Sequence, residues 1–179
     1  MWLILVAIAI VGAVWLLYNQ LVKLKVQSDA AWSDIDVQLK RRHDLVPNLV
    51  ETVKGYATHE KGTLEAVVDA RSRAMSAQGP ADRASAENAL TGTLKSLFAL
   101  AENYPQLRAA DNFGQLQAQL STIEDAIQNA RRYYNAVVRD LNTKVMQFPS
   151  NLIARNFGFS EREFFEMDEA ERSVPKVSF

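Results

Sequence analysis

The first charged side chain of this chain is Lys23, and the 22 residues before it are almost entirely apolar. As a helix, this segment would be about 33 Å long, enough to cross a hydrocarbon core of roughly 30 Å. Trp2 lies near one end and Trp15 and Tyr18 near the other, as expected of rings at the two membrane–water interfaces. The pattern predicts a transmembrane anchor helix over residues 1–22.

A cleaved signal peptide is the alternative, because Ala7-Ile8-Ala9 has the small-x-small form of a cleavage site. Signal peptides carry a basic segment ahead of a short apolar stretch. Here the apolar run begins at residue 2 and continues past Ala9 to Leu17. These features favour a retained anchor.

Basic residues follow the apolar run on its C-terminal side, and only the terminal amine lies on the other side. They are Lys23, Lys25, Lys40, Arg41 and Arg42. The positive-inside rule then places the body of the protein in the cytoplasm and its N-terminus outside, with a single crossing of the membrane. Basic side chains near the bilayer can also contact anionic lipid headgroups, each contact being worth about 1 kcal/mol.

Composition and motifs narrow the possible chemistry. The net charge of -1 argues against a general nucleic-acid partner, and the absence of cysteine excludes disulfides and thiolate sites. Neither His43 nor His59 belongs to a Glu-x-x-His or His-Glu-x-x-His motif, and the glycines are scattered singly. We therefore expect no metal site, no cofactor and no enzymatic activity, although catalysis by one of the two histidines is a disfavoured alternative.

The rest of the chain reads as amphipathic helix. The clearest helix runs from about Asn112 to Phe148, stops at Pro149, and has apolar residues at alternating steps of three and four. Its stripe comprises Phe113, Leu116, Leu120, Ile123, Ile127, Ala130, Tyr134, Val137, Leu141 and Val145. Another helix follows the Gly79-Pro80 connection and ends at Pro105, with a stripe of Ala86, Leu90, Leu94, Leu97, Ala101 and Tyr104.

A further stripe begins nearer the anchor, at Ile35, and its phase persists through Pro47 as far as Ala74. Pro47 predicts either a kink or a new helix, while Gly55 and Gly62 offer another place to turn, so the pattern leaves the break open. Several amphipathic helices with short links predict an all-α protein. We expect a transmembrane helix followed by an elongated antiparallel four-helix bundle over residues 23–155.

The segment 156–179 differs from the bundle because it is both acidic and aromatic. Ser160 and Glu163 have the spacing of a capping box, which predicts a short helix. We expect Phe164, Phe165 and Phe179 to fold back on the bundle, because free acidic tails usually lack so many aromatic residues. A partner-binding peptide is the alternative.

Several polar residues lie on or beside the apolar stripes. Buried charges are tolerated when they are paired and hydrogen-bonded, so we expect these residues to meet across helices. The candidates are Arg42, Glu60, Arg71, Glu102, Glu124, Arg131, Tyr134 and Asn135. The favoured interpretation is a polar network that fixes the register of the bundle, and the alternative is a pocket for a ligand or partner.

The segment from Trp32 to Ala57 resembles the signature of the LemA family. The similarity continues at several later places, which are His59-Glu60, Ala70-Arg71, and residues 101–105, 130–135, 148–154 and 177–179. The resemblance implies a bacterial single-pass membrane protein with a four-helix bundle and no accepted enzymatic activity. Distant relatives are linked to magnetosome membrane formation, which by analogy suggests a role in organising or shaping membrane.

These features lead to two functional hypotheses. The first is a non-enzymatic, membrane-anchored scaffold at the bacterial inner membrane that forms a homo-oligomer or recruits a membrane protein partner. The second is an adaptor or regulatory partner of a membrane protease or envelope-stress enzyme, with the acidic aromatic tail as its docking peptide.

Overall fold

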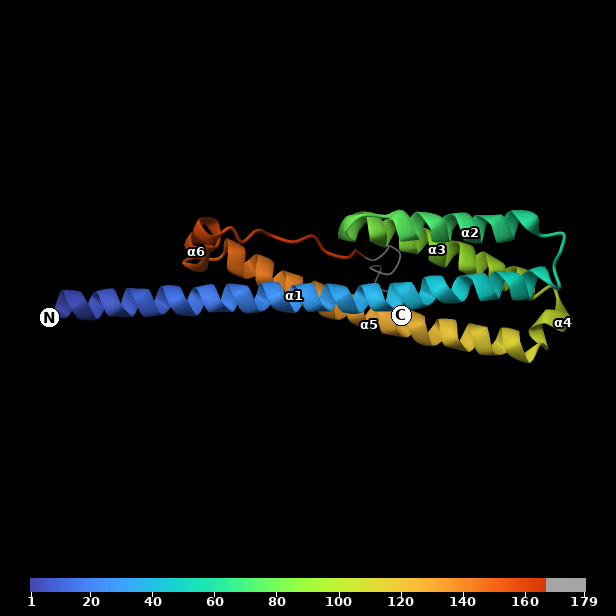
Figure 1. The fold of residues 1–179 in the computed structure, drawn as a ribbon, viewed down its shortest axis with the longest axis horizontal. Helices are drawn as coiled ribbons and strands as arrows, with labels where there is room; N and C mark the ends of the chain where they lie inside the picture. The colour runs from blue at the N-terminus through green and yellow to red at the C-terminus, as the bar shows by residue number, and fades with distance from the viewer. Residues whose placement is uncertain (167–179) are drawn as a thin grey trace, which may run out of the picture. The chain divides into compact units, whose positions relative to one another are not determined.

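The computed structural model describes residues 1–166, which fold into helices with no strand within that range. The predicted all-α fold is confirmed (Figure 1). The helices are α1 (Trp2–Lys54), α2 (Lys61–Ser76), α3 (Gly79–Ala101), α4 (Pro105–Arg108), α5 (Asp111–Met146) and α6 (Ser150–Phe157). Among the described residues, α1 is the helix long and apolar enough to cross a membrane, and its apolar segment is exposed.

The chain divides into two compact units. The first, which we call the anchor unit, consists of residues 1–35 and 129–164. The second, the bundle unit, consists of residues 36–128 together with the described residues 165 and 166. Helices α1 and α5 therefore each contribute residues to both units.

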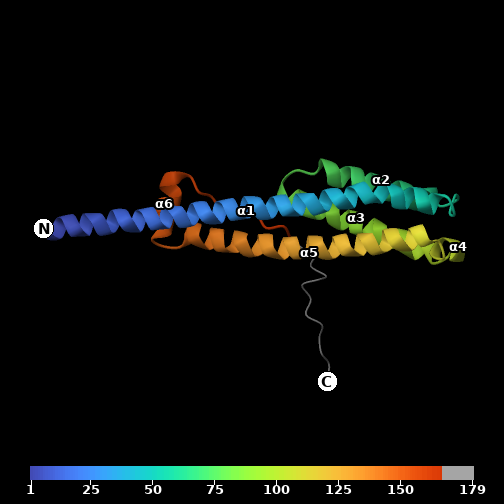
Figure 2. The same ribbon diagram turned by 60° about the horizontal axis from the view of Figure 1, so that its bottom comes forward.

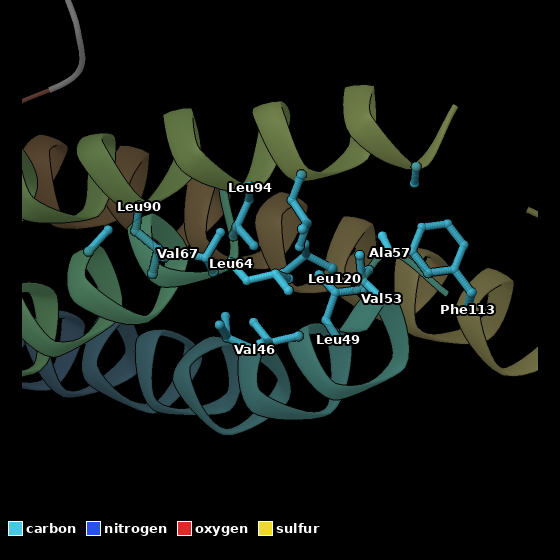
Figure 3. Packing of buried hydrophobic residues seen from close by; sticks show 14 of the residues in the cluster. Val46, Leu49, Val53, Ala57, Leu64, Val67, Leu90, Leu94, Phe113 and Leu120 are labelled. Carbon is cyan, nitrogen blue, oxygen red and sulfur yellow. The ribbon is translucent and has the colours of Figure 1, made fainter. Parts of the chain in front are cut away.

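The bundle unit holds the predicted four-helix bundle. The C-terminal part of α1, then α2, α3 and the N-terminal part of α5 run alternately up and down and lie side by side in Figures 1 and 2. Figure 3 shows their apolar side chains meeting between the helices. The buried cluster comprises Val46, Leu49, Val50, Val53, Ala57, Leu64, Val67, Ala70, Ala74, Leu90, Leu94, Leu97, Ala101, Leu107, Phe113 and Leu120.

The structure decides where the first bundle helix ends. Helix α1 continues through Pro47 and stops at Lys54, and residues 55–60 form the turn into α2. The amide groups of Gly55 and Ala57 donate to the carbonyls of Glu51 and Val53, which satisfies acceptors at the helix end. The chain therefore turns at the glycine segment and not at the proline.

The anchor unit contains α1 up to residue 35, α5 from residue 129, and α6. It has a smaller apolar cluster, formed by Leu21, Leu141 and Ala154 with partly buried neighbours such as Phe159. The turn between α5 and α6 is closed by the Ser150 hydroxyl, which donates to the carbonyls of Lys144 (2.6 Å) and Gln147 (2.8 Å).

The predicted short helix at Ser160–Glu163 is wrong. Residues 159–166 have no regular secondary structure, because side chains of α5 hold residues 162 and 163 through their backbone groups. We call residues 158–164 the strap. Phe165 is fully buried, Phe164 is 37% exposed, and the prediction for Phe179 lies outside the described residues. The stripe analysis also missed the two short helices, α4 and α6.

Candidate functional site

A buried arginine joins three helices of the bundle unit. Arg42, on α1, is only 2% exposed and donates from Nη1 to Glu87 Oε2 of α3 at 3.0 Å. Its Nη2 donates to the hydroxyl of Thr91 at 2.6 Å and lies 2.8 Å from Glu124 Oε1 of α5. The guanidinium therefore cross-links α1 to both α3 and α5.

Glu87 extends this cluster to a second residue of α1. Its other oxygen, Oε1, lies 2.7 Å from His43 Nε2, and both side chains are buried. A carboxylate accepts hydrogen bonds, so this ring nitrogen is the donor. We call Arg42, His43, Glu87, Thr91 and Glu124 the ionic cluster. One carboxylate at its centre thus binds two consecutive residues of α1.

The side chain of Arg71, on α2, binds a backbone carbonyl next to the ionic cluster. Its Nε donates to the carbonyl oxygen of His43 at 2.7 Å. In a regular helix that carbonyl would accept from the amide of residue 47, but residue 47 is proline and has no N–H. Pro47 therefore leaves an acceptor open inside α1, and Arg71 of α2 satisfies it.

Two further polar contacts tie the bundle helices together outside the ionic cluster. Arg83 of α3 pairs with Asp36 of α1. The hydroxyl of Tyr104 donates to Glu60 Oε1 at 3.2 Å. Glu60 directly precedes α2 and Tyr104 directly precedes α4, so this bond joins two loops of the bundle unit. Desolvation raises the pKa of Tyr104, and the hydrogen bond to Glu60 acts in the same direction.

Desolvation limits the net stability that the ionic cluster adds. Removing charges from water costs several kcal/mol per ion, and their mutual attraction only offsets that cost when geometry and hydrogen bonding are good. Here Arg42 Nε is buried and has no acceptor among the described residues. Sliding or exchanging a helix would separate Arg42 from Glu87, so the cluster penalises alternative packings of the bundle.

The other residues predicted for the polar network lie outside the ionic cluster. Glu102 is exposed, and no ion pair or hydrogen bond of its side chain is found in the described chain. Arg131, Tyr134 and Asn135 belong to the anchor unit. The basic residues Lys23, Lys25, Lys40 and Arg41 are all exposed, whereas Arg42 is buried in the cluster.

Sequence reasoning missed three members of the ionic cluster, which are His43, Glu87 and Thr91. Glu87 lies three residues before Leu90, so it continues the stripe of α3 backwards at helical spacing. A carboxylate at that position, facing an arginine on the stripe of α1, is the signal that could have identified it. His43 carries no comparable signal beyond following Arg42 directly.

In the anchor unit, polar side chains of α5 bind the strap. Asn142 donates to the carbonyl of Arg162 at 2.9 Å and accepts from its amide at 2.8 Å. The Tyr134 hydroxyl donates to the carbonyl of Glu163 at 2.9 Å, and its ring packs 5.3 Å from that of Trp32. Arg162 in turn donates to Asp29 of α1 at 2.6 Å.

Tyr134 also illustrates the electrostatics of that contact. Desolvation raises the pKa of its phenol above the ordinary value, the positive charge of Arg162 opposes this rise, and Glu163 and Asp29 support it. The neutral phenol is therefore the form that fits the folded protein, in agreement with its role as a hydrogen-bond donor to the strap.

A surface groove of about 500 Å³ lies between the end of α1 and α2 in the bundle unit. Its apolar lining comes from Val50, Leu64 and Val68, and Val68 is 49% exposed. Its rim carries both signs of charge, from Glu51, Lys54, Lys61, Glu65 and Asp69. An apolar floor with a charged rim has the character of a surface that receives an amphipathic peptide segment.

The arrangement of the ionic cluster has little room for chemistry on a substrate. Arg42 and Glu87 are each less than 4% exposed, so a reactant would have to displace packed helices to reach them. Within residues 1–166, no group of three or more His, Asp or Glu side chains is placed to hold a metal ion. What the cluster can do is hold α1, α3 and α5 together.

Sequence comparisons with known proteins identify the family of this chain. The chain is 27% identical to Protein LemA of Metamycoplasma hominis over 94% of its own length and 80% of that protein. It is 24% identical to Magnetosome protein MamQ 2 of Paramagnetospirillum magneticum, over 91% of this chain and 70% of the relative. It is also 24% identical to Magnetosome protein MamQ of Magnetospirillum gryphiswaldense, over 90% and 69%. The profile of the LemA family matches residues 31–179, and the chain belongs to that family.

Proposed function

We propose that this protein is a non-enzymatic, membrane-anchored helical scaffold that self-associates or recruits partner proteins at the cytoplasmic face of the bacterial membrane. The observation that carries the proposal is the composition of α1. This one uninterrupted helix holds both the apolar segment and Arg42, the residue on which the ionic cluster is built. The tether and the first helix of the bundle are thus one element.

Membrane association follows from the apolar segment, and its direction follows from charge. Residues 1–22 form the anchor in this proposal, residues 23–155 the body, and residues 156–179 a tail. The exposed side chains of Lys23 and Lys25 directly follow the apolar run, as the positive-inside rule requires of a cytoplasmic flank. They also place positive charge where anionic headgroups lie.

The groove between α1 and α2 is the surface that we assign to partner recruitment. It combines an apolar floor, of which Val68 is exposed, with charges of both signs at its rim, whereas Arg42, His43 and Glu87 of the ionic cluster are buried. In this proposal the buried charges fix the packing of the bundle helices, and the groove between α1 and α2 binds the partner. The magnetosome proteins among the relatives support, by analogy, a role in organising or shaping membrane.

The experiment compares two substitutions on exposed faces of α2. Val68→Lys places a charge on the apolar floor of the groove, and Ala66→Lys, the control, places the same charge on an exposed residue that does not line it. In native membranes, photo-crosslinking from residue 65 should capture a second copy or a partner in the wild type and in the control, and should fail in Val68→Lys. Equal capture by all three proteins would overturn the assignment of the groove.

A compartment-specific reporter fused to residue 179 tests the membrane anchor and the cytoplasmic location of the body. Reporter activity in the cytoplasm and retention in the membrane after carbonate washing are the expected results. Release by carbonate, or a mature chain that begins after Ala9, would refute the tether itself.

The second candidate function is an adaptor or regulatory partner of a membrane protease or envelope-stress enzyme. It is favoured by the exposed acidic side chains of Glu161 and Glu163 in the strap. Glu161→Gln with Glu163→Gln removes these charges, leaves the backbone groups of the strap that hydrogen-bond to α5 in place, and separates the two functions. Scaffold assembly should survive the double substitution, whereas adaptor binding should be lost.

A further inference from the structure

We infer that α6 and the turn before it insert into the interfacial layer of the bilayer that α1 crosses, as a second and monotopic contact with anionic lipid. The inference rests on the proposed tether and goes beyond it. A single crossing helix leaves the protein free to rotate and tilt, whereas a second contact beside it defines how the chain meets the surface.

The first observation is the level at which α6 lies along α1. The ring of Tyr18 contacts those of Phe157 and Phe159, with centroid distances of 4.9 Å and 5.8 Å. Lys23, the first charge, follows about 7.5 Å further along the helix axis. Tyrosine rings at the end of an apolar span belong to the membrane–water interface. The end of α6 is therefore at that depth too.

The second observation is the apolar surface that this region leaves uncovered. Met146, Phe148, Leu152 and Phe157 are 59%, 73%, 51% and 57% exposed, and all lie within one short segment around α6. Isolated exposed apolar residues are ordinary, but a gathering of large ones marks a contact surface. Burying apolar surface is favourable in proportion to its area, so insertion of these side chains supplies a driving force.

The third observation is the sign of the charge around that surface. Residues 1–28 and 141–160 contain four basic side chains, Lys23, Lys25, Lys144 and Arg155, and no Asp or Glu. The nearest acidic residues in the sequence are Asp29, Asp140 and Glu161, just outside these two segments. Apolar side chains beside uncompensated positive charge are typical of segments that lie on anionic membranes. This charge pattern favours lipid over a protein partner.

The chain contains no cysteine, so single probes can be placed without background. Phe148→Cys and Leu152→Cys carry an environment-sensitive fluorophore on the proposed insertion surface. Asp140→Cys is the matched control on α5, exposed but outside that surface, and Ala7→Cys reports on the span itself. Each full-length variant is placed in vesicles of phosphatidylcholine and phosphatidylglycerol, and quenching by lipid-borne nitroxide is compared with quenching by aqueous iodide.

The expected result is that lipid-borne nitroxide quenches the probes at 148 and 152 at least about threefold more than the probe at 140, while iodide shows the reverse order. Equal nitroxide quenching at 152 and 140 would overturn the inference. Protection of 148 and 152 from both quenchers would also overturn it, because a second protein copy would then cover the surface. The probe at Ala7 separates the two proposals, since its failure to be quenched by lipid would refute the tether instead.

A charge variant tests the lipid chemistry. Lys144→Gln with Arg155→Gln leaves the apolar side chains in place and removes two of the four positive charges. Nitroxide quenching of the probe at Leu152→Cys should fall in this charge variant. It should also fall when the protein with Lys144 and Arg155 unchanged is placed in vesicles of phosphatidylcholine alone. Unchanged quenching in both arms would refute the role of anionic headgroups.

Discussion

Two polar arrangements, one in each unit of this protein, use side chains in different ways. In the bundle unit, Arg42 and Glu87 are buried charged side chains that bond to other side chains across helices. In the anchor unit, Asn142 and Tyr134 are neutral side chains that bond to the backbone of the strap. The first arrangement fixes which helices are neighbours, and the second holds a segment that has no helix of its own.

This difference shows where side-chain pairs between helices are needed and where side chains must bind the backbone. Helices satisfy their own backbone groups, so the charges between them act through side chains and select the packing. The strap has no internal backbone ladder, and its N–H and C=O groups need partners from outside. Breaking the two arrangements should therefore give different outcomes, a cooperative loss of stability in one and a local opening in the other.

The largest effect is expected for Glu87→Ala. This change removes the carboxylate shared by Arg42 and His43 and leaves a buried guanidinium with less compensation. We expect the free energy of unfolding to fall by about 3–5 kcal/mol. Chemical denaturation of the full chain in mild detergent, followed by circular dichroism, measures it. Glu102→Ala, an exposed control, should change it by less than about 0.5 kcal/mol. Equal behaviour of the two variants would show that the cluster does not select the packing.

Next in size is the contact between Arg71 and the His43 carbonyl. Arg71→Ala leaves that carbonyl without its donor and should cost about 1–3 kcal/mol, measured by the same denaturation. In a Pro47→Ala background the new amide of residue 47 can donate to the carbonyl, so the same change should cost about 1 kcal/mol less. Additive costs in the double-mutant cycle would contradict the compensation between Pro47 and Arg71.

A smaller and local effect is expected for Asn142→Ala. It removes two hydrogen bonds to residue 162 but leaves α5 able to form. Hydrogen exchange at the Arg162 amide should become about tenfold faster, which corresponds to about 1.4 kcal/mol. Exchange in α3 should not change, and Asn156→Ala on the exposed side of α6 should leave residue 162 protected. A cooperative loss of protection throughout both units would contradict the local role of the strap.

The smallest expected effect is a decrease in the stability of the fold at alkaline pH. Desolvation raises the pKa of Tyr134, so the stability that its neutral phenol contributes is fully present below about 10 and is lost as pH rises through the folded-state value. Tyrosinate absorbance should therefore show a tyrosine that titrates above the ordinary value in the wild type, and the contribution of Tyr134 to this signal should be absent in Tyr134→Phe. Tyr134→Phe should weaken the fall in stability above about pH 10, and Tyr133→Phe should not. The reverse ranking would exclude a buried phenol at the strap.

Sequence periodicity identified the helices that pack along continuous stripes. The stripe from Phe113 to Val145 predicted α5, and the LemA resemblance is confirmed by the family match. The short elements escaped because Pro105–Arg108 and Ser150–Phe157 each span too few turns for a repeat to emerge. The capping box at Ser160 failed because a local signal of about 1 kcal/mol competes with the hydrogen bonds that α5 offers to residues 162 and 163.

The sequence by itself determined an apolar helix long enough for a bilayer, a body of amphipathic helices and a set of polar residues on their apolar faces. Only the tertiary structure decided that Glu87 is the partner of Arg42 and that α1 passes through Pro47. It also decided that α6 lies beside Tyr18. The reason is physical: periodicity is a property of neighbouring residues in one helix. The contacts of Arg42 with Glu87, of Tyr18 with α6, and of Arg71 with the carbonyl that Pro47 leaves open all join residues from different helices. A pattern along the chain shows that a buried charge needs a partner, and the packing of the helices chooses which one it receives.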